Sequence, residues 1–349
     1  MKAAVYYNNK DIRIEEVSKP VINPDEILVK TIACGLCGGE AMEWYHIQRA
    51  PKVMGHEPAG IIEEVGRDVR GYSVGDRIFV NHHAINVNSH LSIRGHYTKD
   101  HEYHRSKLDP GGMCEYFKIS ADHIRTSIIR LPDDLPFGEA TVLEPWGCVI
   151  GGLKKSNIQP GDTVAVVGCG FMGQGFIHMA HLFGAGKVIA CDLSDYRLEK
   201  ALEAGANATV NPGKEDPVDA LRSLNGGREA DVVISTVPSV KVIEQAYNMV
   251  YTGGTLHINA PSPVDEVWQF RPNDMYTKEI TITTKYSADH GDIYQLFELI
   301  QSGKVNPSLG ITHRFGLNGI QEAFELLVKG GESLKSVLYP HGIDKEIQI

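Results

Sequence analysis

The chain has 349 residues, 42% of them hydrophobic and 22% charged, and it carries a formal net charge of −10. This length exceeds one ordinary hydrophobic core and predicts two domains, and the acidic balance argues against nucleic acid or an anionic membrane as the main partner. No apolar run reaches membrane-spanning length, and the first residues, MKAAVYYNNK, lack the apolar core of a signal peptide, so we expect a cytoplasmic protein.

The first 150 residues contain short β-like runs that are broken by Gly, Pro and Asp. Examples are Glu26 to Ile32, Gly60 to Val65, Arg77 to Val80 and Glu115 to Ile119. Strands do not alternate with helices there as they do in parallel βαβ units. The pattern predicts a mostly antiparallel barrel or sandwich for this region.

Three short motifs in the same region carry metal-ligand chemistry. They read Cys34-Gly35-Leu36-Cys37-Gly38-Gly39-Glu40, Gly55-His56-Glu57 and Leu143-Glu144-Pro145. A thiolate, an imidazole and a carboxylate can form an open zinc site with one position left for water or substrate. Taken singly, the cysteine pair can also be a redox pair and the His-Glu step a surface pair. The six cysteines are too few and too scattered for a disulfide framework.

From about Asn157 the pattern changes to alternating strands and helices. Strand-like runs at 163–167, 187–191, 231–235, 255–258 and 280–283 alternate with helix-like stretches at 195–204, 217–224 and 239–250. This alternation predicts an open parallel sheet with helices on both faces. A helical stretch at 292–302 and two short strands at 311–315 and 336–339 follow.

Residues 164–192 have the strand–turn–helix–strand order of a dinucleotide-binding unit. The turn reads Gly168-Cys169-Gly170-Phe171-Met172-Gly173. Gly168 permits the tight turn, Gly170 lets the backbone approach a pyrophosphate, and Gly173 lets helix and strand pack closely. Asp192, about 20 residues further on, can accept hydrogen bonds from a ribose diol and would repel a 2′-phosphate. The unit therefore predicts NAD rather than NADP as the cofactor.

Together these motifs resemble the zinc-dependent medium-chain dehydrogenase/reductase family, and most of all its polyol (sorbitol-like) and threonine dehydrogenase branches. The segments that carry the resemblance are GLCGGE, GHEPAGIIEEVG, VGDRI, DPGGMCEYFKI, LEP, the nucleotide unit and ITHRFGL with EAF. The resemblance implies an α/β protein: a GroES-like, mostly β catalytic domain over 1–148 and 290–349, and a Rossmann NAD-binding domain over 149–289.

The resemblance also implies the site residues. Cys37 and His56 would bind a catalytic zinc, while Glu57 and Glu144 would lie beside it, bound directly or through water. Glu40 follows Cys37 by three residues in the sequence and is a further catalytic candidate. On the cofactor side, the resemblance implies that the turn residues Gly168 to Gly173 and Asp192 bind NAD. Arg197 would cover the adenine side. The residues that would line the nicotinamide are Val237, Asn259 and Tyr286.

The chain departs from the family at the lobe that often holds a second, structural zinc. The four cysteine positions carry no thiol here, so we expect one catalytic zinc and no structural zinc. The residues at these positions are Asn86, Ser89, Ser92 and Asp100. Histidines in or near the lobe are a weaker metal-binding candidate; they are His82, His83, His90, His96, His101 and His104.

A second departure affects proton transfer. The family usually has a Ser or Thr hydroxyl where this chain has Gly39, and several members have a His where it has Met42. The usual proton relay is therefore incomplete. Glu40, Glu57, Glu144, His46 or a bound water are the candidate substitutes.

The resulting hypothesis is hydride transfer between NAD and a secondary alcohol on a polyol, cyclitol or sugar derivative, by a homodimer or homotetramer. One alternative is an enzyme that oxidises its substrate transiently with tightly held NAD and so achieves epimerisation, elimination or bond cleavage. A second is a nucleotide or redox sensor without catalysis. Candidate substrate contacts are Trp44, Tyr45, His46 and Trp146, and candidate anion contacts are Lys52, Arg105 and Lys285.

Overall fold

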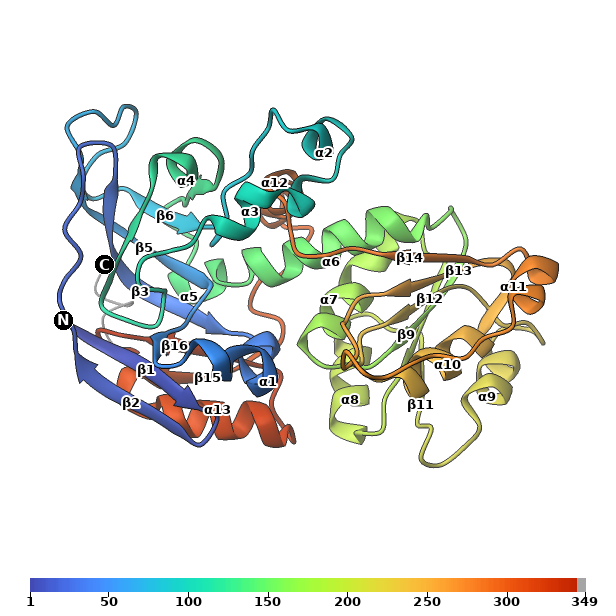
Figure 1. Cartoon of the computed structure of the whole chain (residues 1–349). Coiled ribbons are helices and arrows are strands. Elements are labelled where there is room, and N and C mark those ends of the chain that lie inside the picture. The colour runs from blue at the N-terminus through green and yellow to red at the C-terminus, as the bar shows by residue number, and fades with distance from the viewer. Residues whose placement is uncertain (344–349) are drawn as a thin grey trace. The chain divides into compact units, whose positions relative to one another are not determined.

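The structure is a computed structural model that describes residues 1–343 and divides into two compact units. The first unit comprises residues 1–147, 289–300 and the chain from 306 onward, and the second comprises 148–288 and 301–305. Helix α6 (Leu143–Ser156) begins in the first unit and ends in the second (Figure 1). Across residues 1–343, no helix combines the length and the apolar character needed to cross a membrane.

The first unit is built on two sheets, a seven-stranded one with the path β15-β16-β3-β5-β6-β8 plus β7 on β3, and a three-stranded one, β2-β1-β4. Every pairing in them is antiparallel except that of β15 with β16. The strands are β1 (Lys2–Asn8), β2 (Asp11–Glu16), β3 (Ile27–Leu36), β4 (Lys52–Val53), β5 (Glu57–Val65), β6 (Arg77–Val80), β7 (Tyr116–Ile119), β8 (Ile128–Arg130), β15 (Ile311–Gly316) and β16 (Lys335–Tyr339).

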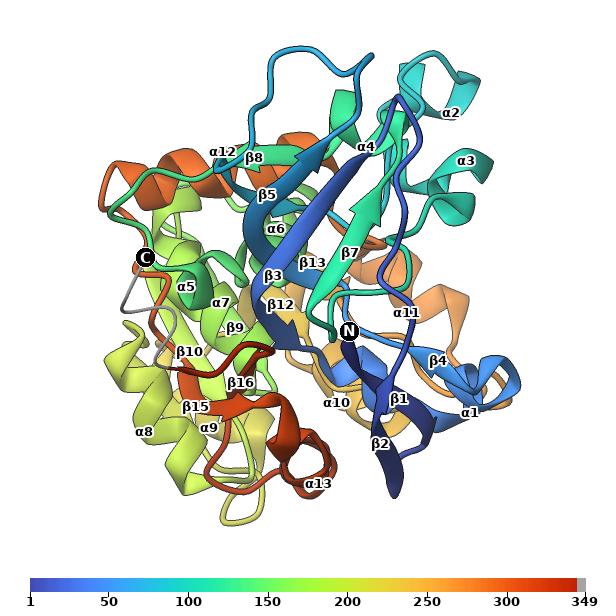
Figure 2. The same ribbon diagram turned by 90° about the vertical axis from the view of Figure 1, so that its left-hand side faces the viewer.

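Short helices connect these strands. They are η1 (Gly38–Ala41), α1 (Glu43–His46), η2 (Ile47–Arg49), α2 (His90–Ile93), η3 (Tyr97–Lys99), α3 (His101–Arg105), α4 (Ala121–Thr126), α5 (Phe137–Ala140), α12 (His290–Gln301), η5 (Leu317–Gly319) and α13 (Ile320–Lys329), where η marks a 3-10 helix. Strand β3 is central because β5 and β7 both pair with it, as Figure 2 shows. Nine of its ten residues are buried, so it reads as a nearly continuous apolar run rather than an alternating one.

The second unit holds a six-stranded parallel sheet in the order β11-β10-β9-β12-β13-β14, flanked by helices (Figure 1). Its elements are β9 (Thr163–Val167), α7 (Phe171–Ala180), η4 (His181–Phe183), β10 (Lys187–Cys191), α8 (Asp195–Glu203), β11 (Ala208–Val210), α9 (Pro217–Leu224), β12 (Ala230–Ser235), α10 (Val240–Asn248), β13 (Val250–Ile258), α11 (Pro272–Lys278) and β14 (Thr281–Thr284).

Local sequence explains these elements. All five residues of β9 are buried, as expected for a central parallel strand covered on both faces. Helix α9 starts where Asp216 caps it, its carboxylate accepting from the backbone N–H groups of Val218 and Asp219, with Pro217 in the first turn. The strand order reverses between β9 and β12, which is where a doubly wound sheet opens a ligand crevice. The predicted α/β class, with an antiparallel region followed by a parallel sheet, is confirmed.

Candidate active site

Strand pairing brings the predicted metal ligands together. Cys37 directly follows β3, and His56 and Glu57 stand at the start of β5. The two strands pair antiparallel, with Gly35 opposite Glu57. Side chains that are 19 residues apart in the chain therefore meet at one end of the sheet.

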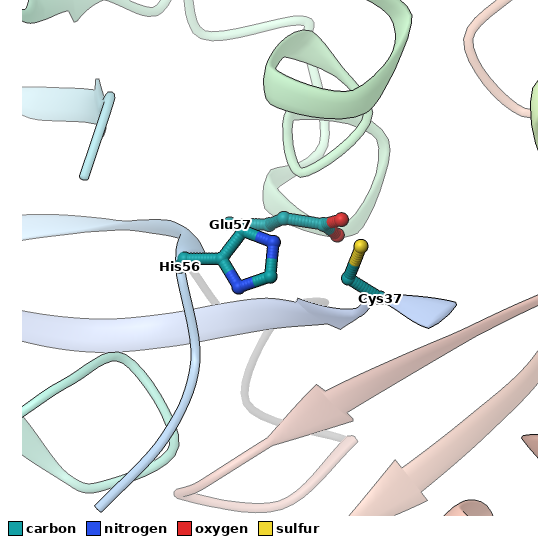
Figure 3. Close-up of side chains that lie close together, drawn as sticks. All are labelled: Cys37, His56 and Glu57. Carbon is teal, nitrogen blue, oxygen red and sulfur yellow. The ribbon is translucent and has the colours of Figure 1, made fainter. Parts of the chain in front are cut away.

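The side chains of Cys37, His56 and Glu57 point toward one another, and their ligand atoms all lie within 4.8 Å (Figure 3). Within residues 1–343 this is the single group of three or more His, Cys, Asp or Glu side chains that converges in this way. Thiolate, imidazole and carboxylate are the donors that zinc prefers, and three protein ligands leave a fourth position open.

Glu57 is fully buried and its two carboxylate oxygens have different surroundings. Oε2 accepts a short hydrogen bond from the ammonium group of Lys335, which is also buried. Oε1 has no hydrogen-bond partner among the described residues. A buried carboxylate oxygen without a partner is costly, and a metal ion next to it would remove that cost.

Gly35 makes the Glu57–Lys335 ion pair possible. A Cβ atom at Gly35 would lie 1.9 Å from Glu57 Oε2 and 3.0 Å from Lys335 Cε. Strand β16 pairs with β3 on the opposite edge from β5, with Ser336 opposite Leu36. The ion pair thus crosses β3 at the one residue whose missing side chain leaves room for it.

Glu40 holds the ligand loops in place. Its Oε2 accepts from the backbone N–H of Cys37 (3.1 Å), and its Oε1 accepts from the N–H of Gly55 (2.8 Å) and from His56 Nδ1 (3.1 Å). Burial would raise the pKa of Glu40, but His56 and these hydrogen bonds outweigh it, so the pKa is lowered. Because Glu40 accepts from Nδ1, Nε2 is the His56 atom that could bind a metal, an arrangement typical of metal-binding histidines.

Glu144 lies at the start of α6, buried, and outside the three-residue group. Its Oε1 is 3.9 Å from His82 Nδ1, and the His82 ring lies 4.9 Å from the His56 ring, centroid to centroid. Burial raises the pKa of Glu144 to about 7, with His56 opposing this shift and Glu57 adding to it. Its carboxyl group can therefore exchange a proton near neutral pH.

The missing hydroxyl at Gly39 is not imposed by the backbone. A Cβ atom there would meet Cys37 Sγ and Met42 Cε at 3.6 Å, an ordinary contact distance. Gly39 N–H donates to Cys37 Sγ (3.4 Å), and its carbonyl accepts from His46 Nε2 (3.1 Å). A serine would fit at this position, so its absence here is a property of this chain's chemistry and not of its fold.

Hydrogen bonds organise the lobe that holds cysteines in many members of the family. Ser89 Oγ accepts from the N–H of Ser92 (3.1 Å) and caps α2. Asp100 Oδ1 accepts from the N–H of Glu102 (2.9 Å) and caps α3. Asn86 Oδ1 accepts from the N–H of Asn88 (3.1 Å). Three of the four positions thus fix local turns in this chain.

The three glycines of the turn between β9 and α7 have different surroundings. Gly168 has φ +92°, and a Cβ there would clash with Thr236 and Val237. A Cβ at Gly173 would lie 2.0 Å from the Gly168 carbonyl oxygen, so helix α7 packs directly on the turn. At Gly170 the nearest atom to a Cβ is Arg197 Nη1 at 4.0 Å, which leaves the backbone open to a ligand at the N-terminus of α7.

Asp192 lies at the end of β10 beside this turn. Its Oδ2 accepts from the N–H of Cys169 (2.7 Å), and its Oδ1 accepts from the N–H of Ser194 (2.8 Å). These bonds fix the carboxylate while leaving further lone pairs for a ribose diol. Arg197 Nε is buried and has no hydrogen-bond partner among residues 1–343, so the turn also presents an unsatisfied donor.

The remaining predicted residues lie where the strands of the parallel sheet end. Val237 follows β12 and touches the turn at Gly168, Asn259 follows β13, and Tyr286 follows β14. Phe171 and Met172 open helix α7. Of the aromatic candidates in the first unit, Trp146 is fully buried in the core, whereas Trp44 and Tyr45 are 52% and 42% exposed.

The sequence motifs did not indicate that Lys335 contacts Glu57 or that His82 lies beside His56. Lys335 comes from the last strand, almost 280 residues after Glu57, and a lone lysine before an apolar run gives no signal in the sequence. His82 was grouped only with the other histidines of its segment. Its position beside His56 and Glu144 depends on the pairing of β5 with β6.

Comparisons with known proteins agree with this geometry. Residues 23–133 match the model of an alcohol dehydrogenase GroES-like domain, and residues 172–302 match that of a zinc-binding dehydrogenase. The chain is 30% identical to sorbitol dehydrogenase of Bacillus subtilis over 98% of both chains, and 31% identical to L-threonine 3-dehydrogenase of the same organism over 94% of both. Among solved structures, an alcohol dehydrogenase from a Thermus species has a TM-score of 0.87 at 26% identity, covering 97% of this chain and 99% of its own.

The chain therefore belongs to the zinc-dependent medium-chain dehydrogenase/reductase family, and the resemblance stated from the motifs is confirmed. It is an oxidoreductase of the alcohol and polyol dehydrogenase type.

We expect Lys335→Met to destabilise the metal-free protein by about 3–5 kcal/mol, because it leaves the Glu57 carboxylate buried without its cation. Lys329→Met is the matched control, since Lys329 forms an exposed pair with Glu325, and such pairs are worth under about 1 kcal/mol. Urea unfolding after chelation measures both. Equal losses in the two variants would show that the buried ion pair contributes little.

Proposed function

We propose that this chain is a zinc-dependent, NAD-linked dehydrogenase that oxidises a secondary alcohol on a polyol, cyclitol or sugar derivative. The observation that carries the proposal is the convergence of Cys37, His56 and Glu57 within 4.8 Å in the first unit. Relatives named as sorbitol, L-threonine 3- and (R,R)-butanediol dehydrogenases support a hydroxylated substrate. They also favour net hydride transfer over the transient oxidation considered as an alternative.

The donor set fits one catalytic zinc. Cys37 and His56 would hold it, with Glu57 through its unsatisfied Oε1 or Glu144 completing the set. We propose a single zinc per chain, because Asn86, Ser89 and Asp100 already form local hydrogen bonds in the lobe.

The glycine turn and Asp192 support NAD as the cofactor. The open backbone at Gly170 suits a pyrophosphate, and the Asp192 carboxylate suits a free 2′-hydroxyl and disfavours a 2′-phosphate. When bound, zinc would polarise the alcohol oxygen and NAD⁺ would accept the hydride. We propose that Val237, Asn259 and Tyr286 line the nicotinamide side and Arg197 the adenine side.

The chain's own groups would bind the substrate and carry its proton. Glu40 positions Cys37 and His56 by accepting hydrogen bonds from both. Glu144 is best suited to take up the substrate proton at its carboxylate, because burial raises its pKa to about 7. Proton transfer would then bypass position 39, where the usual hydroxyl is missing.

We also propose that the two compact units correspond to a catalytic domain, residues 1–148 and 290–349, and a NAD-binding domain, residues 149–289. The assembly would be a homodimer or homotetramer, and the enzyme would act in the cytoplasm. Size-exclusion chromatography with light scattering measures the assembly.

We expect about one zinc per chain, and we expect Cys37→Ala to lose both zinc and turnover, because it removes the thiolate ligand. Cys34→Ala is the matched control, since Cys34 is a fully buried thiol of the same motif that lies outside the ligand group. Elemental analysis and NADH formation measure the two effects. An active, zinc-free Cys37→Ala enzyme would contradict the metal assignment.

We expect Asp192→Ala to raise the KM for NAD⁺ by about tenfold or more, as for loss of one charge-assisted hydrogen bond, with zinc content unchanged. Asp195→Ala removes a nearby, exposed carboxylate that pairs with Lys214, and it should leave the KM nearly unaltered. Steady-state kinetics with NAD⁺ and NADP⁺ test both variants. An unchanged KM in Asp192→Ala would remove the basis for the choice of NAD.

The direct test of the proposed function is incubation of the zinc-loaded enzyme with NAD⁺ and a panel of polyols, cyclitols, sugar derivatives and simple alcohols. NADH formation and substrate loss are followed in parallel. We expect NADH to rise in proportion to substrate loss for at least one polyhydroxylated compound. Substrate loss without NADH would instead establish transient oxidation by retained cofactor.

A further inference from the structure

Lys52 is a half-buried cation that has no carboxylate oxygen within 4.0 Å among residues 1–343. Lys52, in β4, donates from Nζ to His46 Nδ1 at 2.7 Å. The same imidazole donates from Nε2 to the Gly39 carbonyl at 3.1 Å. His46 is neutral, because burial and the neighbouring Lys52 ammonium lower its pKa to about 4. The hydrogen-bond partner of Lys52 therefore carries no negative charge.

The charges of two exposed cations, Arg49 and Lys107, also act on Lys52. Burial lowers the pKa of Lys52, Glu40 raises it, and the charges of Arg49 and Lys107 lower it further. Arg49 lies over the Tyr45 ring, 4.4 Å from its centroid. Within residues 1–343, none of Arg49, Lys52 and Lys107 has a carboxylate oxygen within 4.0 Å.

The carboxylates nearby are already engaged. Glu40 accepts from two backbone N–H groups and from His56, and Glu43 accepts from the N–H of Asn9 (3.0 Å). Arg105, the other cation of this unit considered as an anion contact, lies 3.5 Å from Glu102. Of these three cations Lys52 is the one that is partly buried, while Arg49 and Lys107 are exposed. A partly buried charge is costly unless an anion compensates it.

We propose that Lys52, with Arg49 and Lys107, binds a phosphate group on the substrate, so that the enzyme acts on a phosphorylated polyol or sugar derivative. Three cations match a dianionic phosphate, and a lysine ammonium is a common phosphate ligand. Two hydrogen bonds through His46 connect Lys52 to Gly39, which itself donates to Cys37 Sγ. The proposal places a substrate hydroxyl at the ligand group and the phosphate of the same molecule at Lys52.

This inference rests on the proposed dehydrogenase function, and the experiment separates the two. The zinc-loaded enzyme is assayed with NAD⁺ and matched hexitols, hexitol monophosphates and hexonic acids. We expect kcat/KM to be at least about tenfold higher for a monophosphate than for its parent hexitol, as for a charged hydrogen bond. Lys52→Met should abolish this preference, and Arg49→Gln and Lys107→Gln should each weaken it. Arg67→Gln, which removes an exposed cation from the loop after β5, is the matched control and should leave it unchanged.

Turnover of hexitols with no gain from phosphate would overturn the inference while supporting the proposed function. An equal gain for the hexonic acids would overturn the assignment to phosphate. If no compound reduces NAD⁺, the proposed function fails, and calorimetric titration of the same enzymes with glycerol phosphate still decides the inference. The inference is supported if glycerol phosphate binds the unmodified enzyme and Arg67→Gln but does not bind Lys52→Met. It is overturned if glycerol phosphate does not bind the unmodified enzyme, or if Lys52→Met binds it equally well.

Discussion

The buried ion pair between Glu57 and Lys335 across β3 is the interaction on which the arrangement of the candidate metal site depends. It forms because β5 and β16 flank β3 and because Gly35 has no side chain to occupy the space between them. The pair joins β5 to β16, the last strand of the first unit. Glu57 Oε1 has no hydrogen-bond partner among the described residues, which is the observation behind its proposed role as a metal ligand.

Two carboxyl groups near this pair, those of Glu40 and Glu144, have pKa values shifted in opposite directions. Glu40 keeps a lowered pKa because His56 and two backbone N–H groups stabilise its anion. Burial raises the pKa of Glu144 to about 7, and the charges of His56 and Lys335 offset this only in part. One carboxylate can therefore orient ligands while another exchanges a proton, which is how one site divides positioning from acid–base work.

In the second unit, local steric requirements account for the three glycines of the turn between β9 and α7. Each glycine of its turn has a separate steric reason: the positive φ of Gly168, the open approach at Gly170 and the contact of Gly173 with the Gly168 carbonyl. These requirements are local, so they are visible in the spacing of the motif. Asp192 adds to them because β10 runs parallel to β9 and ends beside the turn.

The sequence by itself determined the α/β class, the parallel sheet and the presence of Cys37, His56 and Glu57, because hydrophobic periodicity and short motifs are local properties of the chain. Tertiary structure alone decided that Lys335 would neutralise Glu57 and that Glu40 would hold the loops of Cys37 and His56. It also decided that Lys52 would have a neutral histidine as its hydrogen-bond partner. These contacts join residues up to 278 positions apart. They depend on strand register and on which charges are buried together, and no local pattern encodes either.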